Sequence, residues 1–151
     1  MARCVFCNFL KSGAKHSNGF PFLPIHETKH SISFLSVDFP DKEDGHTLVI
    51  PKIHGRAIYD LPKAVQHDLM EHVALMSRIL RKRHGGCNIL LNDGKHAGQT
   101  VMHAHFHLVP RDEGDKIKIE VWRRKEMEEE SFQYLTEVMR TEVSKMRRRG
   151  L

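Results

Sequence analysis

Apolar and polar residues alternate most clearly between Gln99 and Pro110, a pattern that predicts one β-strand ending at a proline. Successive side chains of a strand point to opposite faces, so His103, His105 and His107 are expected on one face and the apolar residues between them on the other. Near neutral pH, histidine can serve as a nucleophile, a general acid or base, or a metal ligand. Three imidazoles on one surface therefore mark a candidate site.

Shorter patterns predict further strands. Two strand-like stretches lie at about 24–30 and 32–39, and β-branched residues alternate through 45–54. The apolar run at 87–91 is expected to be a buried strand, and 117–122 alternates like an edge strand. The chain is therefore expected to build a sheet from several short strands.

Two stretches repeat apolar residues at spacings of three and four and predict amphipathic helices. The first follows Asp60, a candidate cap, and ends at Gly85 and Gly86; the second begins near Glu126, with glutamates at its start and basic residues at its end. We assign the first helix to packing, and we expect its histidines in solvent: His67, His72 and His84. The apolar positions are Val65, Leu69, Val73, Met76 and Leu80 in the first helix and Phe132, Leu135, Met139, Val143 and Met146 in the second.

Size and composition suit one domain with a modest core, because the chain has 151 residues of which 40% are hydrophobic. No apolar run reaches the roughly 18 residues of a membrane span, and no signal-like segment follows Met1. We therefore expect a soluble intracellular protein without membrane contact. The expected compartment is the cytoplasm, or also the nucleus. Of the formal net charge of +5, four charges come from residues 145–149. This basic tail is expected to be solvated, with an acidic partner or nucleic acid as the alternative.

Cys4 and Cys7 form a CxxC motif, which in an intracellular chain indicates half of a zinc site or a redox pair. The βαβ context of a thioredoxin-like redox pair is missing around it. The alternative to zinc is two buried cysteines without a metal. A closed disulfide framework is disfavoured because the chain has three cysteines, an odd number.

The stretch from Asn92 to Thr100 is a glycine-bearing turn that leads directly into the histidine strand. Glycine lets backbone N–H groups approach an anion closely, and Gln99 and Thr100 add side-chain donors. A plain hairpin is the ordinary interpretation of such a turn. A loop that binds an anion such as phosphate is the functional alternative.

Three motifs in this order resemble the histidine triad (HIT) superfamily of nucleotide hydrolases and transferases, in particular its Hint-like branch with an N-terminal CxxC. They are the His-φ-His-φ-His-φ-φ pattern at 103–109, where φ is apolar, the segment Gly-His-x-Leu-Val-Ile-Pro-Lys-x-His at 45–54, and the turn Asn-x-Gly-x-x-x-Gly-Gln-Thr at 92–100. The polar loop at 12–19 departs from the shorter Gly-x-Ile-Pro turn usual in the superfamily. The resemblance implies an α+β fold with an antiparallel five-stranded sheet and a long helix, here with an extra C-terminal helix. On this basis residues 1–122 are a HIT domain and residues 123–151 a helical extension with a basic tail.

The resemblance also implies roles for individual residues. His105 takes the nucleophile position, and the expected catalytic set is His105, His107, His46, Gln99 and Thr100. Asp38 lies eight residues before His46, as does the ribose-binding aspartate of the family. The expected nucleotide-binding set is Val5, Phe6, Phe9, Asp38, Phe39, Leu48, Asn92, Gly98, Gln99, Thr100, His105 and His107. A structural zinc ion is expected on Cys4, Cys7, His54 and His103, with no organic cofactor.

The function expected from this resemblance is hydrolysis of nucleoside 5′-phosphoramidates, in which AMP or GMP is linked to an amine, by a homodimer that binds purine nucleotides. A nucleotidyl-His105 intermediate would form and then be hydrolysed. Hydrolysis of dinucleoside polyphosphates is the rival enzyme activity. A DNA-deadenylating, aprataxin-like role lacks its zinc finger, because no cysteine follows Cys87. The rival from another class is a non-catalytic zinc- or nucleotide-binding module, with one metal held by His103, His105 and His107.

Overall fold

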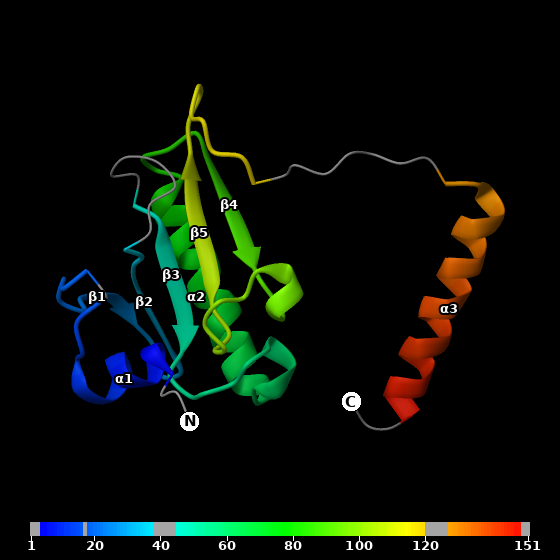
Figure 1. Cartoon of the computed structure of the whole chain (residues 1–151), viewed down its shortest axis with the longest axis horizontal. Helices are drawn as coiled ribbons and strands as arrows, with labels where there is room; N and C mark the ends of the chain where they lie inside the picture. Colours follow the sequence, from blue (N-terminus) through cyan, green and yellow to red (C-terminus); the bar gives the residue numbers. More distant parts are fainter. Residues whose placement is uncertain (1–3, 17, 38–44, 120–126, 149–151) are drawn as a thin grey trace. The chain divides into compact units, whose positions relative to one another are not determined.

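The structure is a computed structural model that describes residues 4–16, 18–37, 45–119 and 127–148. The chain divides into two compact units, Met1–Ile117 and Lys118–Leu151 (Figure 1). Among the described residues, no helix has the length and apolar character needed to cross a membrane.

The first unit is built on one five-stranded sheet in which every neighbouring pair of strands is antiparallel. The strand order is β1-β2-β3-β5-β4. All five residues of β3, the central strand, are buried, as expected for a run of apolar and β-branched residues with a neighbour on each side. The strands are β1 (Pro24–Glu27), β2 (Ser31–Leu35), β3 (Thr47–Pro51), β4 (Gly86–Leu91) and β5 (Phe106–Arg111).

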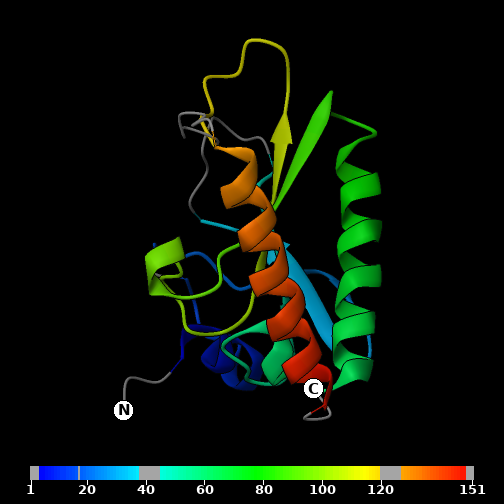
Figure 2. The same cartoon turned by 90° about the vertical axis from the view of Figure 1, so that its right-hand side faces the viewer.

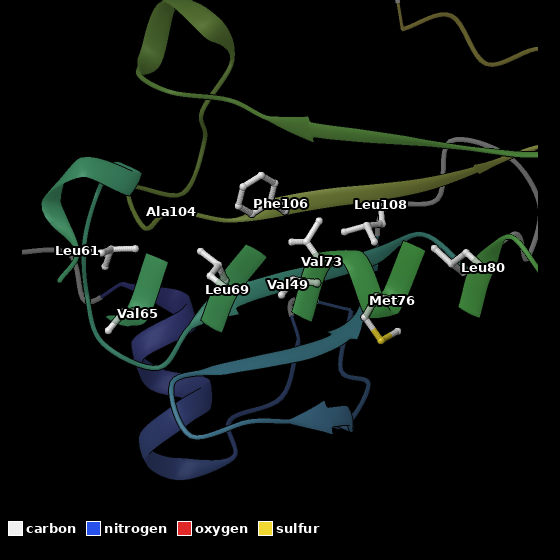
Figure 3. Packing of buried hydrophobic residues seen from close by; sticks show 10 residues of the cluster. All are labelled: Val49, Leu61, Val65, Leu69, Val73, Met76, Leu80, Ala104, Phe106 and Leu108. Atoms are coloured by element: carbon white, nitrogen blue, oxygen red, sulfur yellow. The ribbon is translucent and has the colours of Figure 1, made fainter. Parts of the chain in front are cut away.

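Two helices cover opposite faces of this sheet (Figures 1 and 2). Helix α2 (Lys63–Leu80) lays its apolar face on β3 and β5, where Leu69 and Leu108 are both fully buried (Figure 3). Helix α1 (Val5–Ser12) inserts Phe6 and Phe9 against the other face. The helix α1 side of the sheet carries the candidate site, and the helix α2 side supplies most of the hydrophobic core.

The strand that carries the histidines is shorter than its sequence pattern predicts. Strand β5 begins at Phe106, whereas residues 99–105 are irregular, with bends at 101–103. The chain leaves strand geometry here because the Ala104 amide donates to the Gly55 carbonyl, at 2.7 Å, and the His103 amide donates to Val101, at 2.8 Å. The expectation that three imidazoles alternate along one strand is therefore wrong, since only His107 lies in β5.

Several smaller expectations are also corrected. Strand β4 is a half-buried edge of the sheet rather than a buried strand. Of the edge strand predicted at 117–122, residues 117–119 form no strand and the remainder lies outside the described residues. Asp60 does not cap α2: its carboxylate accepts from the Arg56 and Ala57 amides and closes a short 3₁₀ turn, Ile58–Asp60.

Two of the three histidines expected in solvent have partners. His67 is exposed, as predicted. His72 is only 1% exposed and lies between Ser31 and Ser33, and His84 contacts the Asp112 carboxylate at 2.7 Å. The helical spacing could not reveal these partners, because they come from other elements.

The second unit contains α3 (Glu129–Arg148), which confirms the predicted C-terminal helix. Glutamates lie in its first turn and basic residues in its last, so both ends complement the helix dipole. The apolar positions of its predicted stripe are exposed: Phe132, Leu135, Met139, Val143 and Met146. The proposed boundary between residues 122 and 123 lies outside the described residues.

Candidate active site and metal centre

His105 is held in one tautomer by the backbone. Its Nδ1 donates to the His103 carbonyl at 2.7 Å, and the side chain is 4% exposed. Burial lowers the pKa of His105, with the His103 carbonyl opposing and His46 adding to this shift. The ring is therefore neutral at pH 7, with a proton on Nδ1 and a lone pair on Nε2. This is the protonation state that a nucleophilic imidazole needs.

His107 and His46 lie beside this ring. The His107 ring centre is 4.8 Å from that of His105 and 5.3 Å from that of His46, and His46 Nε2 lies 3.1 Å from His107 Nδ1. Burial, together with the neighbouring His105 and His46, lowers the pKa of His107 to about 4. The β3–β5 register places Leu48 opposite His107, so adjacent strands bring these residues together. The three imidazoles of the expected catalytic set thus lie together, while His103 lies with the cysteines.

A cavity of about 180 Å³ opens in front of His105 and His107. Seven predicted nucleotide-binding residues line it: Val5, Phe6, Phe9, Leu48, Thr100, His105 and His107. Five residues outside the predicted set also line it: His16, Phe34, Ser36, Val37 and Val101. His16 belongs to the polar loop that departs from the family pattern, which was the one available signal. Asp38 and Phe39 lie outside the described residues.

The predicted phosphate loop is tied to the neighbouring backbone through Gln99. The Gly94 amide donates to Gln99 Oε1 at 2.9 Å, and Gln99 Nε2 donates to the Arg56 carbonyl at 2.8 Å. Gln99 is buried, whereas Asn92 is half-buried and Gly98 is exposed at a positive φ of 86°. Gln99 thus positions the loop. Direct phosphate contacts by Asn92, Gly98 and Gln99 stay predictions.

Four residues form a cluster whose ligand atoms all lie within 4.8 Å of one another: Cys4, Cys7, His54 and His103. Cys4 precedes α1 and Cys7 lies in its first turn, so a spacing of three puts both sulfurs on one side of the helix. Helix α1 was not predicted around this CxxC. The cluster itself agrees with the four expected metal ligands.

The distances in this cluster fit a tetrahedral zinc ion. His103 Nδ1 lies 3.5 Å from Cys4 Sγ and 3.7 Å from Cys7 Sγ, and His54 Nδ1 lies 3.4 Å from Cys7 Sγ. Zn–S bonds of about 2.3 Å and Zn–N bonds of about 2.0 Å place the ligand atoms about 3.5 Å apart. His103 Nε2 donates to the Pro51 carbonyl at 3.0 Å, which leaves the Nδ1 lone pair facing the sulfurs.

Comparisons with known proteins agree with this geometry. Residues 23–114 match the HIT domain family. The adenosine 5′-monophosphoramidase HNT1 of Saccharomyces cerevisiae is 38% identical over 113 residues, which cover 74% of this chain and 65% of that protein. The chain therefore belongs to the HIT family.

Solved structures share the fold. A HIT family protein from Bacillus subtilis has a TM-score of 0.80 at 28% identity, covering 92% of this chain and 96% of the other. A zinc-bound histidine triad family protein from Mycobacterium smegmatis has a TM-score of 0.65 at 34% identity, covering 94% and 96%. The predicted α+β HIT fold is confirmed, and a relative with zinc exists.

Proposed function

We propose that this protein hydrolyses nucleoside 5′-phosphoramidates, with an adenosine or guanosine monophosphate linked to an amine, through a nucleotidyl-His105 intermediate. The observation that carries the proposal is the Nδ1–H bond of His105 to the His103 carbonyl, which leaves Nε2 as the reactive nitrogen at a cavity. Similarity to a yeast adenosine 5′-monophosphoramidase supports the substrate class.

In the proposed reaction, the His105 Nε2 lone pair attacks the α-phosphorus and the P–N bond to the amine breaks. The amine leaves with a proton supplied by His107 or Thr100, both of which line the cavity. Water then attacks the same phosphorus and returns a proton to the group that protonated the amine, the P–Nε2 bond breaks to restore neutral His105, and the nucleoside monophosphate is released. His107, His46, Gln99 and the loop amides are proposed to stabilise the negative charge that develops on the equatorial oxygens.

Cys4, Cys7, His54 and His103 are proposed to hold one structural zinc ion, whose bound form would tie the start of α1 to the segment that follows β3. Two thiolates and two neutral imidazoles are a closed ligand set suited to structure rather than catalysis. Since Phe6 and Phe9 of α1 line the cavity, the zinc would act on the nucleotide site by fixing the position of that helix.

Three further assignments accompany this proposal. A purine nucleotide is the proposed ligand. A homodimer is the proposed assembly, because the resemblance to Hint-like proteins implies one. The basic end of α3 is proposed to meet an acidic partner or nucleic acid. The proposed compartment is the cytoplasm, with the nucleus as the alternative.

The positions of His103 and His105 also bear on two rival functions. Dinucleoside polyphosphate hydrolysis would use the same nucleophile and differ in its leaving group. A non-catalytic module with zinc on three histidines requires the nitrogens of His103, His105 and His107 to converge. The Nδ1 atom of His103 faces Cys4 and Cys7 instead, which favours the enzyme.

The test compares kcat/KM for an adenosine 5′-phosphoramidate and for a diadenosine polyphosphate. We expect the phosphoramidate to be preferred and the variant His105→Ala to lose at least about 10³-fold in kcat, since removing a nucleophile removes the pathway. His67→Ala is the matched control, because His67 is exposed on α2 and does not line the cavity. Wild-type activity in His105→Ala would refute the proposal, and a preference for the polyphosphate would select the rival activity.

A further inference from the structure

A continuous row of aromatic side chains leads away from the nucleophile along the cavity. The Phe6 ring centre lies 5.3 Å from that of His105, 5.8 Å from that of Phe34 and 6.1 Å from that of Phe9. His16 then lies 4.8 Å from Phe9 and 5.9 Å from Phe34. A flat ligand whose phosphate is at His105 would therefore lie along aromatic rings and reach His16 at its far end.

His16 is held in place by its backbone, while its ring nitrogens remain available. The His16 amide donates to the Phe20 carbonyl, and the Gly19 amide donates to the His16 carbonyl, each at 2.9 Å. The ring packs against Phe9 and Phe22. Within the described part of the chain, no hydrogen bond joins either ring nitrogen of His16 to another residue.

The chemistry of this ring suits a polar ligand edge. Burial lowers the pKa of His16, so the ring is neutral at pH 7 and offers one N–H donor and one acceptor. Among the described residues that line the cavity, the other polar side chains are Ser36, Thr100, His105 and His107. The last three belong to the catalytic set, whereas Phe9 and Phe34, whose rings lie beside His16, are apolar.

We propose that His16 is a specificity-determining residue that hydrogen-bonds the edge of the purine base farthest from the ribose. This inference rests on the proposed function, because it needs a nucleotide whose phosphate lies at His105. In adenine that edge carries the 6-amino group, which donates to the imidazole. In guanine it carries a carbonyl oxygen, which accepts from the imidazole N–H. The aromatic rings would bind any flat base, and His16 would favour bases that carry a hydrogen-bonding 6-substituent over bases that carry none.

The experiment measures kcat/KM for two phosphoramidates of the same amine, one of AMP and one of purine riboside 5′-monophosphate, which lacks the 6-amino group. We expect the wild-type protein to prefer the adenine compound by roughly tenfold, because an unpaired polar group in the site is costly. His16→Phe keeps an aromatic wall but no polar atom, and its preference should fall to about one. His16→Gln keeps a donor and an acceptor and should retain most of the preference.

Calorimetric binding of AMP and of purine riboside 5′-monophosphate gives a readout that needs no turnover. If the wild-type protein hydrolyses neither phosphoramidate but binds AMP more tightly, and His16→Phe abolishes that difference, the proposed reaction fails and the role of His16 stands. If the two ligands bind equally to the wild-type protein, or if His16→Phe weakens both equally, His16 is only a wall of the cavity and the inference is overturned.

Discussion

His72 gives a pH-dependent stability that can be predicted in magnitude. Its Nδ1 donates to Ser31 Oγ at 2.8 Å and its Nε2 lies 3.0 Å from Ser33 Oγ, with Ser31 in turn donating to Asp68. Burial, reinforced by the charge on His26, lowers the pKa of His72 from 6.5 to about 4, while Asp68 opposes this shift and Lys52 adds to it slightly. The neutral ring fits this site, and the protonated ring does not.

The direction of the change in stability with pH follows from the difference between the pKa of His72 in the folded and in the unfolded protein. A histidine whose pKa is lower in the folded protein binds protons more readily when unfolded, so its contribution is complete above pH 6.5 and is lost as the pH falls toward 4. Between pH 8 and pH 5 this one residue removes about 2 kcal/mol from the free energy of unfolding. The pKa of Asp68 lies below its usual value, because hydrogen bonds from Thr28 and Ser31 outweigh burial, so Asp68 stays ionised over this range.

Urea unfolding of the wild-type protein and of His72→Gln at pH 8 and pH 5 tests this value. The other histidines are common to both proteins, so the wild type should lose about 2 kcal/mol more than the variant over this interval. Equal losses in the two proteins would refute the reasoning. If His72→Gln does not fold, an NMR titration of the His72 ring in the wild-type protein replaces the urea comparison. An apparent pKa near 6.5 would then refute the reasoning.

Two other predictions concern the metal site and the core. Elemental analysis of the purified protein should find about one zinc per chain, lost in Cys4→Ser but retained in Cys87→Ser, whose sulfur lies outside the cluster; equal zinc contents in the two variants would contradict the four-ligand site. Leu69 is fully buried between α2 and the sheet, so Leu69→Ala should lower the free energy of unfolding by about 2–5 kcal/mol in denaturant titrations. A loss below about 1 kcal/mol would contradict this, because it would mean that the core rearranges to fill the space left by the leucine side chain.

The elements that the sequence predicts best are those whose own side chains determine their burial. The periodic stripe of α2 predicts which face of the helix meets the core, and the apolar run of β3 predicts a strand with both faces buried; the structure agrees with both. The predicted histidine strand is too long because the alternation of apolar and polar residues continues through 99–105. In the structure, a hydrogen bond from the Ala104 amide to the Gly55 carbonyl takes the backbone out of the sheet. No local pattern contains that contact.

The candidate site was predicted in part for the same reason. The CxxC motif and the resemblance to the HIT superfamily together predict the four ligands of the metal cluster, which the fold brings together from the start of α1, from the segment after β3 and from the loop before β5. His16 and His72 were missed because their environments are made by residues distant in sequence, the aromatic rings around His16 and the β2 serines around His72. A histidine's surroundings, rather than its identity, decide its role.

The most direct test of the proposed reaction is to trap the covalent intermediate. An adenosine 5′-phosphoramidate is mixed with enzyme in a single turnover, quenched, and digested for mass spectrometry of the peptide that contains His105. We predict an adenylyl group on His105 that forms before AMP is released and is absent in His105→Ala. Release of AMP with no adduct, or with the adduct on another residue, would contradict the assignment of His105 as the nucleophile.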